Sequence, residues 1–322
     1  MPIVSVVIPT RNRPAWLKVA VESVLAQTMT DFEIVIALNG ATSETVEMAK
    51  RLAADPRVKV IETGVLTVPG ARNSGMAAAQ GEWIAFLDDD DIWLPRKLEM
   101  QLDAARAAGA GVVTCNYVQF NDHGDIVPSG LPPRPAGLSF AETLLLGNFV
   151  SGGSALIVKA SIIRAMEGWD ERISCCDWDL WRRLSFDHEI HYVDQVLLRY
   201  RRHAANRGDD AAFMLSGMAV HFGKMLQDTP PRLRHMFPAA KRQFFDYLVR
   251  SFLAEGLELD HVSLAQWHAL EARCRELAAR CCKLADERDA LLASRSWRLT
   301  APLRSLSLRA RRLLVGLQQR EN

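Results

Sequence analysis

The residues best suited to chemistry are four consecutive carboxylates, Asp88 to Asp91. They follow a short apolar run, Trp83 to Leu87, which is typical of a buried strand in a parallel sheet. Ligands of open α/β sheets bind outside the carboxyl ends of the strands, and adjacent carboxylates repel one another unless a cation neutralises them. Oxygen ligands suit a hard ion such as Mg²⁺ or Mn²⁺. We therefore predict a divalent-metal site here, with a solvated acidic turn as the alternative.

The elements that would position these carboxylates alternate between strand and helix. Apolar, β-branched runs predict strands over 3–8, 32–38, 58–61, 83–87, 111–120, 155–159 and 191–200. Helical spacing of apolar residues predicts helices over 16–25 and 44–53, one that opens at Gly70, and one from Leu98. This alternation indicates parallel strands with right-handed crossovers. The predicted fold class is α/β, a mostly parallel sheet flanked by helices.

Composition narrows the class of protein. The chain has 322 residues, a net charge of +1 and no apolar run long enough for a transmembrane helix. The first residues are typical of a strand, so we expect no signal peptide. The six cysteines lack the spacing of a zinc site, and we expect free thiols in a reducing cytoplasm.

Five motifs occur in the order found in family-2 glycosyltransferases, which are inverting enzymes of GT-A fold. The first three are the loop 10–13, Gly-Ala-Arg-Asn at 70–73, and Asp-Asp-Asp-Asp-Ile-Trp followed by a Pro at 88–95. The fourth combines Gly-Trp-Asp-Glu at 168–171 with Asp-Trp-Asp-Leu at 177–180, and the fifth is Arg-Arg-His at 201–203. The resemblance covers roughly residues 3 to 204. It implies a GT-A fold, a nucleotide-sugar donor and Mn²⁺ or Mg²⁺ as cofactor.

The resemblance also implies roles for individual residues. Donor-binding residues would be Pro9, Thr10, Arg11, Arg13, Asn39, Arg72, Asp88, Asp89 and Arg202. The metal would be held by Asp90, with help from Asp88 or Asp89. His203 would be a further ligand or a phosphate contact, with a surface histidine as the alternative. Asp177 would be the catalytic base, although its usual Glu neighbour is Cys176 here. Trp178 would either stack on a sugar or belong to the core, and Arg72, in the first turn of its helix, would form an anion site.

Asn39 departs from the family pattern, which has an Asp-Asp pair where this chain has Leu38-Asn39. The Asn carbonyl accepts the N3–H of uracil or thymine, and its amide donates to O4. Guanine has two adjacent donors and favours a carboxylate. The residue therefore indicates a UDP or dTDP donor, whereas a simple Asn-Gly turn is the alternative.

The rest of the chain has a different pattern. We assign the catalytic domain to 1–208 and a helical subdomain to 209–262. A third region covers 263–322. Apolar heptad positions over 267–291 suggest a short coiled coil and a homodimer, with a helix packed on its own domain as the alternative. Residues 295–322 hold seven arginines and one acid, which favours an anionic membrane surface. No recognition motif supports nucleic acid as a partner.

The predicted function is inverting transfer of a sugar to a glycan or lipid-linked acceptor in cell-surface polysaccharide synthesis. The protein would be cytoplasmic and peripheral on the inner face of the membrane. One alternative is a nucleotidyltransferase, but no Gly-rich phosphate loop follows Ile8. A non-catalytic, membrane-associated scaffold is the other alternative.

Overall fold

The computed structural model describes residues 1–254, apart from 122, 125, 128–134, 151, 174–175, 204–205 and 207–210. The chain divides into two compact units. The first is Met1–His221 with Met225–Glu258, and the second is Phe222–Lys224 with Leu259–Asn322. The predicted coiled coil over 267–291 and the basic segment over 295–322 lie outside the described residues, so the fold below is that of the first unit.

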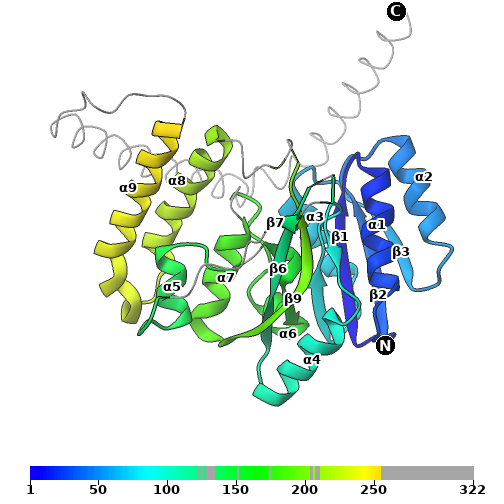
Figure 1. Ribbon diagram of the computed structural model, residues 1–322, viewed down its shortest axis with the longest axis horizontal. Helices are drawn as coiled ribbons and strands as arrows, with labels where there is room; N and C mark the ends of the chain where they lie inside the picture. The colour runs from blue at the N-terminus through cyan, green and yellow to red at the C-terminus, as the bar shows by residue number, and fades with distance from the viewer. Residues whose placement is uncertain are drawn as a thin grey trace, which may run out of the picture. The chain divides into compact units, whose positions relative to one another are not determined.

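The core of this unit is a sheet of nine described strands (Figure 1). Eight of them follow the order β3-β2-β1-β4-β8-β6-β9-β5, and β7 pairs with β6. Their bounds are β1 (Val4–Thr10), β2 (Phe32–Leu38), β3 (Val58–Glu62), β4 (Trp83–Phe86), β5 (Ile92–Trp93), β6 (Val112–Phe120), β7 (Ile126–Val127), β8 (Ile157–Lys159) and β9 (Ile190–Arg201). The strands predicted from the sequence are all present, with ends that differ by at most two residues.

The sheet has a parallel half and a mixed half. The strands β1 to β4 pair in parallel, as predicted. Beyond β4, β8 is antiparallel to both β4 and β6, while β6 and β9 are parallel. The cause lies in the segment before β8. The backbone N–H of Asp88, just after β4, donates to Ser154, so the chain enters β8 at the carboxyl end of β4 and must run backwards.

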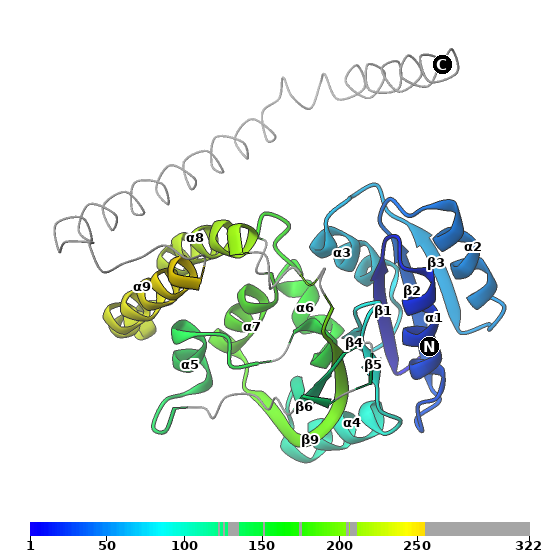
Figure 2. The same cartoon turned by 45° about the horizontal axis from the view of Figure 1, so that its top comes forward.

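Helices cover both faces of the sheet (Figure 2). They are α1 (Pro14–Leu25), α2 (Ser43–Leu52), α3 (Val68–Ala78), α4 (Lys97–Ala108), α5 (Phe140–Leu146), α6 (Ala160–Ala165) and α7 (Cys176–Asp187), with a short 3₁₀ segment η1 (Gly153–Ala155). Side chains alternate along a strand, so Val6 and Ile8 join one hydrophobic cluster with α1, α2 and α4. Val7 joins the other, with α3, α6 and α7.

The helical region predicted from Asp209 contains α8 (Ala211–Asp228), η3 (Pro231–Met236) and α9 (Phe237–Ala254). It is tied to α5, since His235 Nε2 lies 2.9 Å from Glu142 Oε1. The division at residues 208 and 209 stays a prediction. Within the described part of the chain, no helix combines the length and the apolar character needed to cross a membrane.

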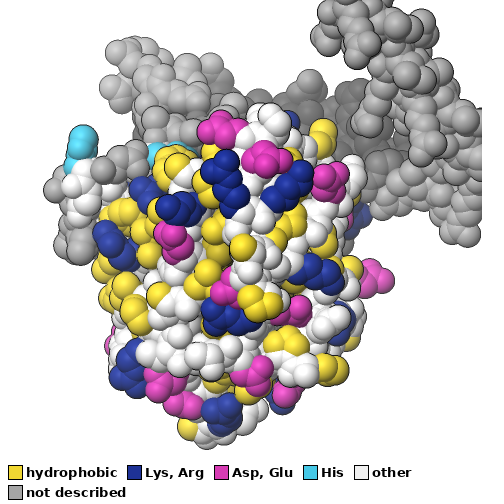
Figure 3. All heavy atoms as spheres, turned by 90° about the vertical axis from the view of Figure 1, so that its right-hand side faces the viewer, with side chains coloured by type: hydrophobic (Ala, Val, Ile, Leu, Met, Phe, Trp, Pro, Cys, Tyr) yellow, Lys and Arg dark blue, Asp and Glu magenta, His cyan; other side chains and the backbone are white. Residues whose placement is uncertain are grey.

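The outer surface beside the parallel half carries both signs of charge. On the face drawn in Figure 3, Lys and Arg side chains are interspersed with Asp and Glu. Exposed ion pairs at helical spacing occur on α1, Lys18 with Glu22, and on α2, Lys50 with Glu47. These exposed pairs contribute little to stability. The concentration of charge that needs explanation lies instead at the carboxyl end of β4.

Candidate functional site

The four carboxylates lie at the carboxyl end of β4, beside the end of β1. Thr10 Oγ1 donates to Asp89 Oδ2 at 2.7 Å, and Arg13 Nη1 lies 3.2 Å from Asp89 Oδ1. The same Arg13 nitrogen donates to Asp90 Oδ2 at 2.5 Å, and His203 Nε2 lies 3.0 Å from that oxygen. Thr10, Arg13, Asp89, Asp90 and His203, which the sequence placed in one site, are therefore together.

Desolvation dominates the electrostatics of this loop. Burial raises the pKa of Asp89 to about 6, with Asp90 adding to the effect. Burial, Asp90 and Asp88 raise the pKa of Asp91 well above its ordinary value, and the Arg201 N–H donates to Asp91 Oδ1 at 3.0 Å. Burial also raises the pKa of Asp88, against the opposing effect of Arg72. A loop whose carboxylates resist ionisation is suited to receive a cation.

Arg72 joins the acidic loop to the predicted base. Its Nη2 donates to Asp88 Oδ1 at 2.6 Å, and its Nη1 donates to Asp177 Oδ1 at 2.7 Å. Burial opposes its charge, yet Asp88 and Asp177 raise the pKa of this guanidinium, which also lies 4.2 Å from the centre of the Trp169 ring. The predicted helix start was wrong by two residues. Thr67 caps α3, because its side chain accepts from the Gly70 N–H, and Arg72 falls in the second turn. Its side chain binds carboxylates, and its contact with phosphate stays a prediction.

Asp177 is the second residue of α7, and its side chain is 30% exposed. Two glycines leave room beside it. A Cβ added at Gly152 would lie 3.4 Å from Asp177 Oδ2, and one at Gly153 would lie 3.1 Å from Arg72 Nη2. Cys176, which replaces the family's Glu, is buried with its Sγ 3.5 Å from Arg72 Nη1. The Arg72–Asp177 contact spans 105 residues of sequence, so no local pattern could have revealed it.

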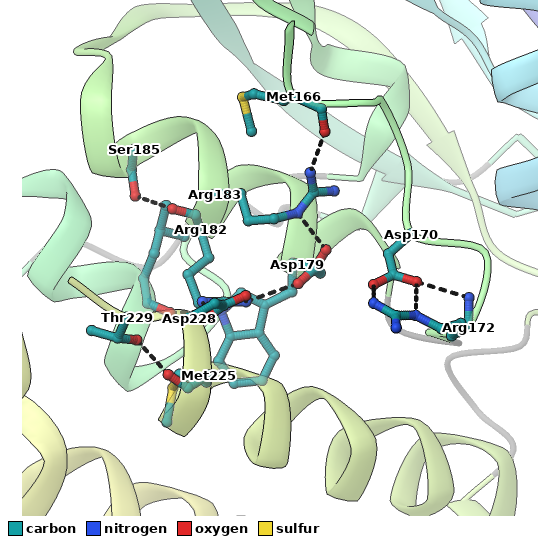
Figure 4. A network of polar contacts seen from close by, with 12 residues as sticks. Met166, Asp170, Arg172, Asp179, Arg182, Arg183, Ser185, Met225, Asp228 and Thr229 are labelled. Carbon is teal, nitrogen blue, oxygen red and sulfur yellow. Dashed lines mark hydrogen bonds and ion pairs between the residues drawn. The ribbon is translucent and has the colours of Figure 1, made fainter. Parts of the chain in front are cut away.

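The helix that carries Asp177 is held by a second ion network (Figure 4). Asp179 Oδ1 accepts from Arg182 Nη2 at 2.9 Å, and its Oδ2 accepts from Arg183 Nε at 2.7 Å. Arg182 also reaches Asp228 at the end of α8, with Nη1 2.5 Å from Oδ1 and Nη2 3.0 Å from Oδ2. Asp179 and Arg182 are completely buried. The network therefore orients α7 against the helical region.

Asn39 ends the second strand and is buried. Its N–H donates to the Thr10 carbonyl at 3.1 Å, while its Oδ1 is buried without a hydrogen-bond partner among the described residues. Gly40 follows with a positive φ of 73°, so the residue also precedes a turn. A buried acceptor without a donor beside the nucleotide loop is what the predicted contact with a base requires.

Other predicted contacts are placed less favourably. Trp178 donates through Nε1 to the Leu144 carbonyl at 2.7 Å and stacks on His221 at 4.3 Å, which agrees with its core alternative. Pro9 is a buried strand residue and Arg11 is exposed. The Arg202 N–H donates to the Phe120 carbonyl at 2.8 Å. Roles for these four side chains in donor binding stay predictions.

Two further residues at the acidic loop are Arg201 and Trp16. Arg201 Nε donates to the Asp90 carbonyl at 2.9 Å, and its guanidinium lies 5.3 Å from the Trp16 ring centre. The Trp16 ring also packs against His203 at 4.6 Å. Trp16 was predicted only as a residue of the covering helix, because an aromatic residue at helical spacing has no signal that separates these roles.

The carboxylate oxygens and the imidazole nitrogen at the acidic loop are atoms of the kinds that bind divalent metals. The described residues contain no group of three His, Cys, Asp or Glu side chains placed to hold an ion. Mg²⁺ and Mn²⁺ usually take one or two carboxylates and complete their shell with water and substrate phosphates. Asp90 Oδ2 lies 2.5 Å from the Arg13 guanidinium nitrogen, so this oxygen accepts positive charge, and His203 Nε2 lies 3.0 Å from it. Asp90, Asp88 and His203 do not form such a group by themselves, so their role as metal ligands stays a prediction.

Comparisons with known proteins agree with this geometry. The sequence model of "Glycosyl transferase family 2" matches residues 5–164. An uncharacterized glycosyltransferase of Methanocaldococcus jannaschii is 28% identical over 205 residues, which cover 62% of this chain and 71% of that protein. One from Rickettsia bellii is 39% identical over 215 residues, covering 66% of this chain but only 30% of that relative. This chain therefore spans less than a third of the second relative's length.

Solved structures show the same fold at low identity. Staphylococcus aureus TarS 1-349 has a TM-score of 0.63 at 15% identity, with 83% of this chain and 78% of that chain covered. A TarS 1-349 crystal structure in complex with UDP-GlcNAc has a TM-score of 0.61, again at 15% identity, covering 83% and 78%. The mannosyltransferase PcManGT from Pyrobaculum calidifontis, in complex with GDP-Man and Mn²⁺, has a TM-score of 0.57 at 16% identity, covering 94% and 84%.

Proposed function

We propose a donor, a mechanism and a location for this chain, which belongs to glycosyltransferase family 2 and has the GT-A fold. It transfers a sugar from a UDP- or dTDP-sugar to a hydroxyl of a glycan or lipid-linked acceptor, with inversion, in cell-surface polysaccharide synthesis. The observation that carries this proposal is the chain of contacts Asp88–Arg72–Asp177, with distances of 2.6 and 2.7 Å. In these contacts, Asp88, which we expect at the diphosphate, and Asp177, which we expect to be the base, bind two nitrogens of one guanidinium.

The donor follows from the chemistry of the first two loops. Asn39 lies next to Thr10, and its buried carbonyl oxygen has no hydrogen-bond partner among the described residues. This oxygen can accept the N3–H of uracil or thymine. Arg13, on the same loop as Thr10, supplies positive charge at Asp89 and Asp90. The structural neighbours were solved with UDP-GlcNAc and with GDP-Man, so a nucleotide-sugar donor is supported, and Asn39 favours the pyrimidine.

A divalent metal would be held by Asp90, with Asp88 and His203 as further ligands. When bound, the ion would neutralise charge on the departing nucleoside diphosphate. The protein's own groups at Asp90 Oδ2 are the Arg13 guanidinium at 2.5 Å and His203 Nε2 at 3.0 Å, so an ion bound through this oxygen would take the place of the guanidinium.

Asp177 is the base of the proposed reaction. Its Oδ1 is fixed by Arg72, and its Oδ2 lies on the side left open by Gly152. The carboxylate removes the proton of an acceptor hydroxyl while that oxygen attacks the anomeric carbon and the nucleoside diphosphate leaves. A single displacement inverts the configuration. General-base action typically contributes about 10² to 10⁴-fold, so positioning must supply much of the remainder.

A nucleotide-sugar screen tests the proposal. The melting temperature of the protein with Mn²⁺ should rise with UDP- or dTDP-sugars more than with GDP-sugars, because binding to the native state stabilises it. Slow release of nucleoside diphosphate from the same donor should depend on the metal. Release of pyrophosphate would identify a nucleotidyltransferase instead. No shift with any nucleotide sugar would favour a non-catalytic scaffold.

The location rests on the segments outside the described residues. We propose that residues 295–322 hold the protein on the cytoplasmic face of an anionic membrane and that 267–291 form a dimer. Each arginine near such a surface contributes on the order of 1 kcal/mol. The full chain should therefore cosediment with anionic vesicles at low salt, and a variant with Arg309, Arg311 and Arg312 changed to Gln should do so less. Equal binding by both chains would remove the membrane role.

A further inference from the structure

A fully buried lysine lies behind the acidic loop. Lys97 is the first residue of α4 and has no solvent-exposed surface. Its Nζ donates to Gln101 Oε1 at 2.7 Å and lies 4.0 Å from the centre of the Trp93 ring. No carboxylate within the described residues forms an ion pair with it. Burial accordingly lowers the pKa of Lys97 to about 8. An apolar side chain would avoid this desolvation cost, so the retained ammonium requires an explanation.

Both partners of this ammonium reach the same short segment. The Trp93 Nε1–H donates to the Ser154 carbonyl at 2.9 Å. An ammonium is only a donor, so Gln101 must turn its Oε1 toward Lys97 and its Nε2 away. That Nε2 then donates to the Ala155 carbonyl at 2.9 Å. The lysine thus fixes two hydrogen bonds that end on adjacent carbonyls of η1.

The segment η1 touches both halves of the site. Ser154 Oγ accepts from the backbone N–H of Asp88 at 3.0 Å, which sets the start of the acidic loop. Gly153 packs against Arg72, and Gly152 lies beside Asp177 Oδ2. A displacement of η1 would therefore be transmitted to Asp88, Arg72 and Asp177 together.

We propose that Lys97 is a positioning residue that acts through Trp93 and Gln101. These three side chains form a clamp, here called the Lys97 clamp, that fixes η1 and with it the distance between the acidic loop and Asp177. The catalytic consequence rests on the proposed function, whereas the effect on η1 does not. The buried ammonium lowers the stability of the fold while it fixes the geometry of the site, a trade-off that is common at functional sites.

The test is Lys97→Met, which keeps the apolar stem and removes the charge. Lys159→Met is the matched control, because Lys159 Nζ also lies near a tryptophan ring, 5.7 Å from the centre of Trp83, at the opposite end of β4. Hydrogen exchange of peptides covering 152–156 and 86–91 is measured with the melting temperature. The rate of Mn²⁺-dependent UDP release from UDP-GlcNAc, or from whichever nucleotide sugar the screen identifies, is measured alongside.

The clamp predicts a combination that a purely structural lysine would not produce. In Lys97→Met the melting temperature should be unchanged or higher, because a buried ammonium has been removed. Exchange over 152–156 should rise about tenfold, and kcat should fall about tenfold or more with KM for the donor changed by less than about twofold, since small displacements of reacting groups carry costs of this size. Lys159→Met should change none of these quantities.

Several outcomes would overturn the proposal. Unchanged exchange over 152–156 in Lys97→Met would do so, as would a lower melting temperature with exchange raised throughout the domain. If Lys97→Met does not fold, Trp93→Phe keeps a ring beside the ammonium and removes only the donor to Ser154, and unchanged exchange over 152–156 in that variant would reject the clamp. If the wild type turns over no nucleotide sugar, the proposed function fails, while the exchange comparison still decides on the clamp.

Discussion

Two clusters of buried charge lie on opposite sides of the start of α7, and they differ in how fully their carboxylates are paired. In the α7 network, both oxygens of Asp179 and both oxygens of Asp228 accept hydrogen bonds from arginines. In the acidic loop, four carboxylates crowd the end of one strand. Burial raises the pKa values of three of them, Asp88, Asp89 and Asp91.

This difference in pairing distinguishes the α7 network, a structural cluster, from the acidic loop, the proposed binding site. A completed network holds its geometry without further partners, and removing one member leaves a buried charge uncompensated. The acidic loop has an excess of negative charge that lowers stability, and the cation and diphosphate of the proposed function would offset it. Substitutions in the α7 network should therefore lower stability first, and substitutions in the loop should lower activity first.

The largest effect is expected for Asp90→Asn. This change removes the carboxylate that Arg13 and His203 share and that would bind the metal. Metal-assisted charge neutralisation contributes several kcal/mol, so turnover should fall by about 10³-fold or more. The melting temperature without metal should not fall, because one of four repelling carboxylates is gone. Activity is measured as nucleoside diphosphate release, and Mn²⁺ binding by calorimetry. Full activity would remove Asp90 from the site.

The sequence located this cluster because its signals are local. An uncharged apolar run followed by four acids identifies a strand end, and the second strand, predicted over Phe32–Leu38, is observed with those bounds. Burial, in contrast, depends on residues that are distant in the sequence. Lys97 follows Pro95 and Arg96 at a helix start, where a lysine is typical of a solvent-exposed residue, yet tertiary packing encloses it. Contacts between distant segments, such as Arg72 with Asp177, could not be predicted from local sequence patterns for the same reason.

The second prediction concerns Arg182→Met in the α7 network. It leaves Asp179 and Asp228 with fewer donors, and removing one partner of a buried pair costs about 3 kcal/mol or more of unfolding free energy. Arg106→Met is the control, because the Arg106–Asp103 pair is about two-thirds exposed and contributes about 1 kcal/mol at most. Denaturant titration measures both. Equal losses in the two variants would show that the buried network does not hold α7.

The third prediction compares two acids of α7 that are two residues apart. Asp177→Asn should lower kcat by about 10²-fold, the usual share of a general base, with little change in donor affinity or melting temperature. Asp179→Asn should do the reverse, since both of its oxygens bind arginines in the completed network. If Asp177→Asn abolishes donor binding instead and leaves the turnover of bound donor unchanged, Asp177 is a binding residue.

The fourth prediction uses the pH dependence of Asp89. Its pKa is about 6 in the folded protein, above its ordinary value of 3.8, so the native state holds the proton more tightly. As the pH falls from 6 toward 4 without metal, the unfolding free energy of the wild type should rise relative to that of Asp89→Asn, by up to about 1.4 kcal/mol per pH unit. Denaturant titrations of both proteins across this window measure the difference. A wild-type unfolding free energy that decreases, relative to that of Asp89→Asn, as the pH falls would contradict the assigned direction.

The smallest effect is expected for Asn39, whose buried Oδ1 has no hydrogen-bond partner among the described residues. Asn39→Asp replaces an amide that accepts one N–H and donates to O4 with a carboxylate that accepts the two adjacent donors of guanine. The ratio of GDP to UDP affinity, measured by calorimetry with Mn²⁺, should therefore rise by about tenfold, the effect of about one hydrogen bond. Asn12→Asp is the control, because Asn12 lies on the neighbouring loop, where its Oδ1 already accepts from the Thr42 N–H at 2.9 Å. A burial cost alone would weaken both nucleotides equally. An unchanged ratio in Asn39→Asp would therefore leave Asn39 as a turn residue before Gly40 and would remove the pyrimidine preference.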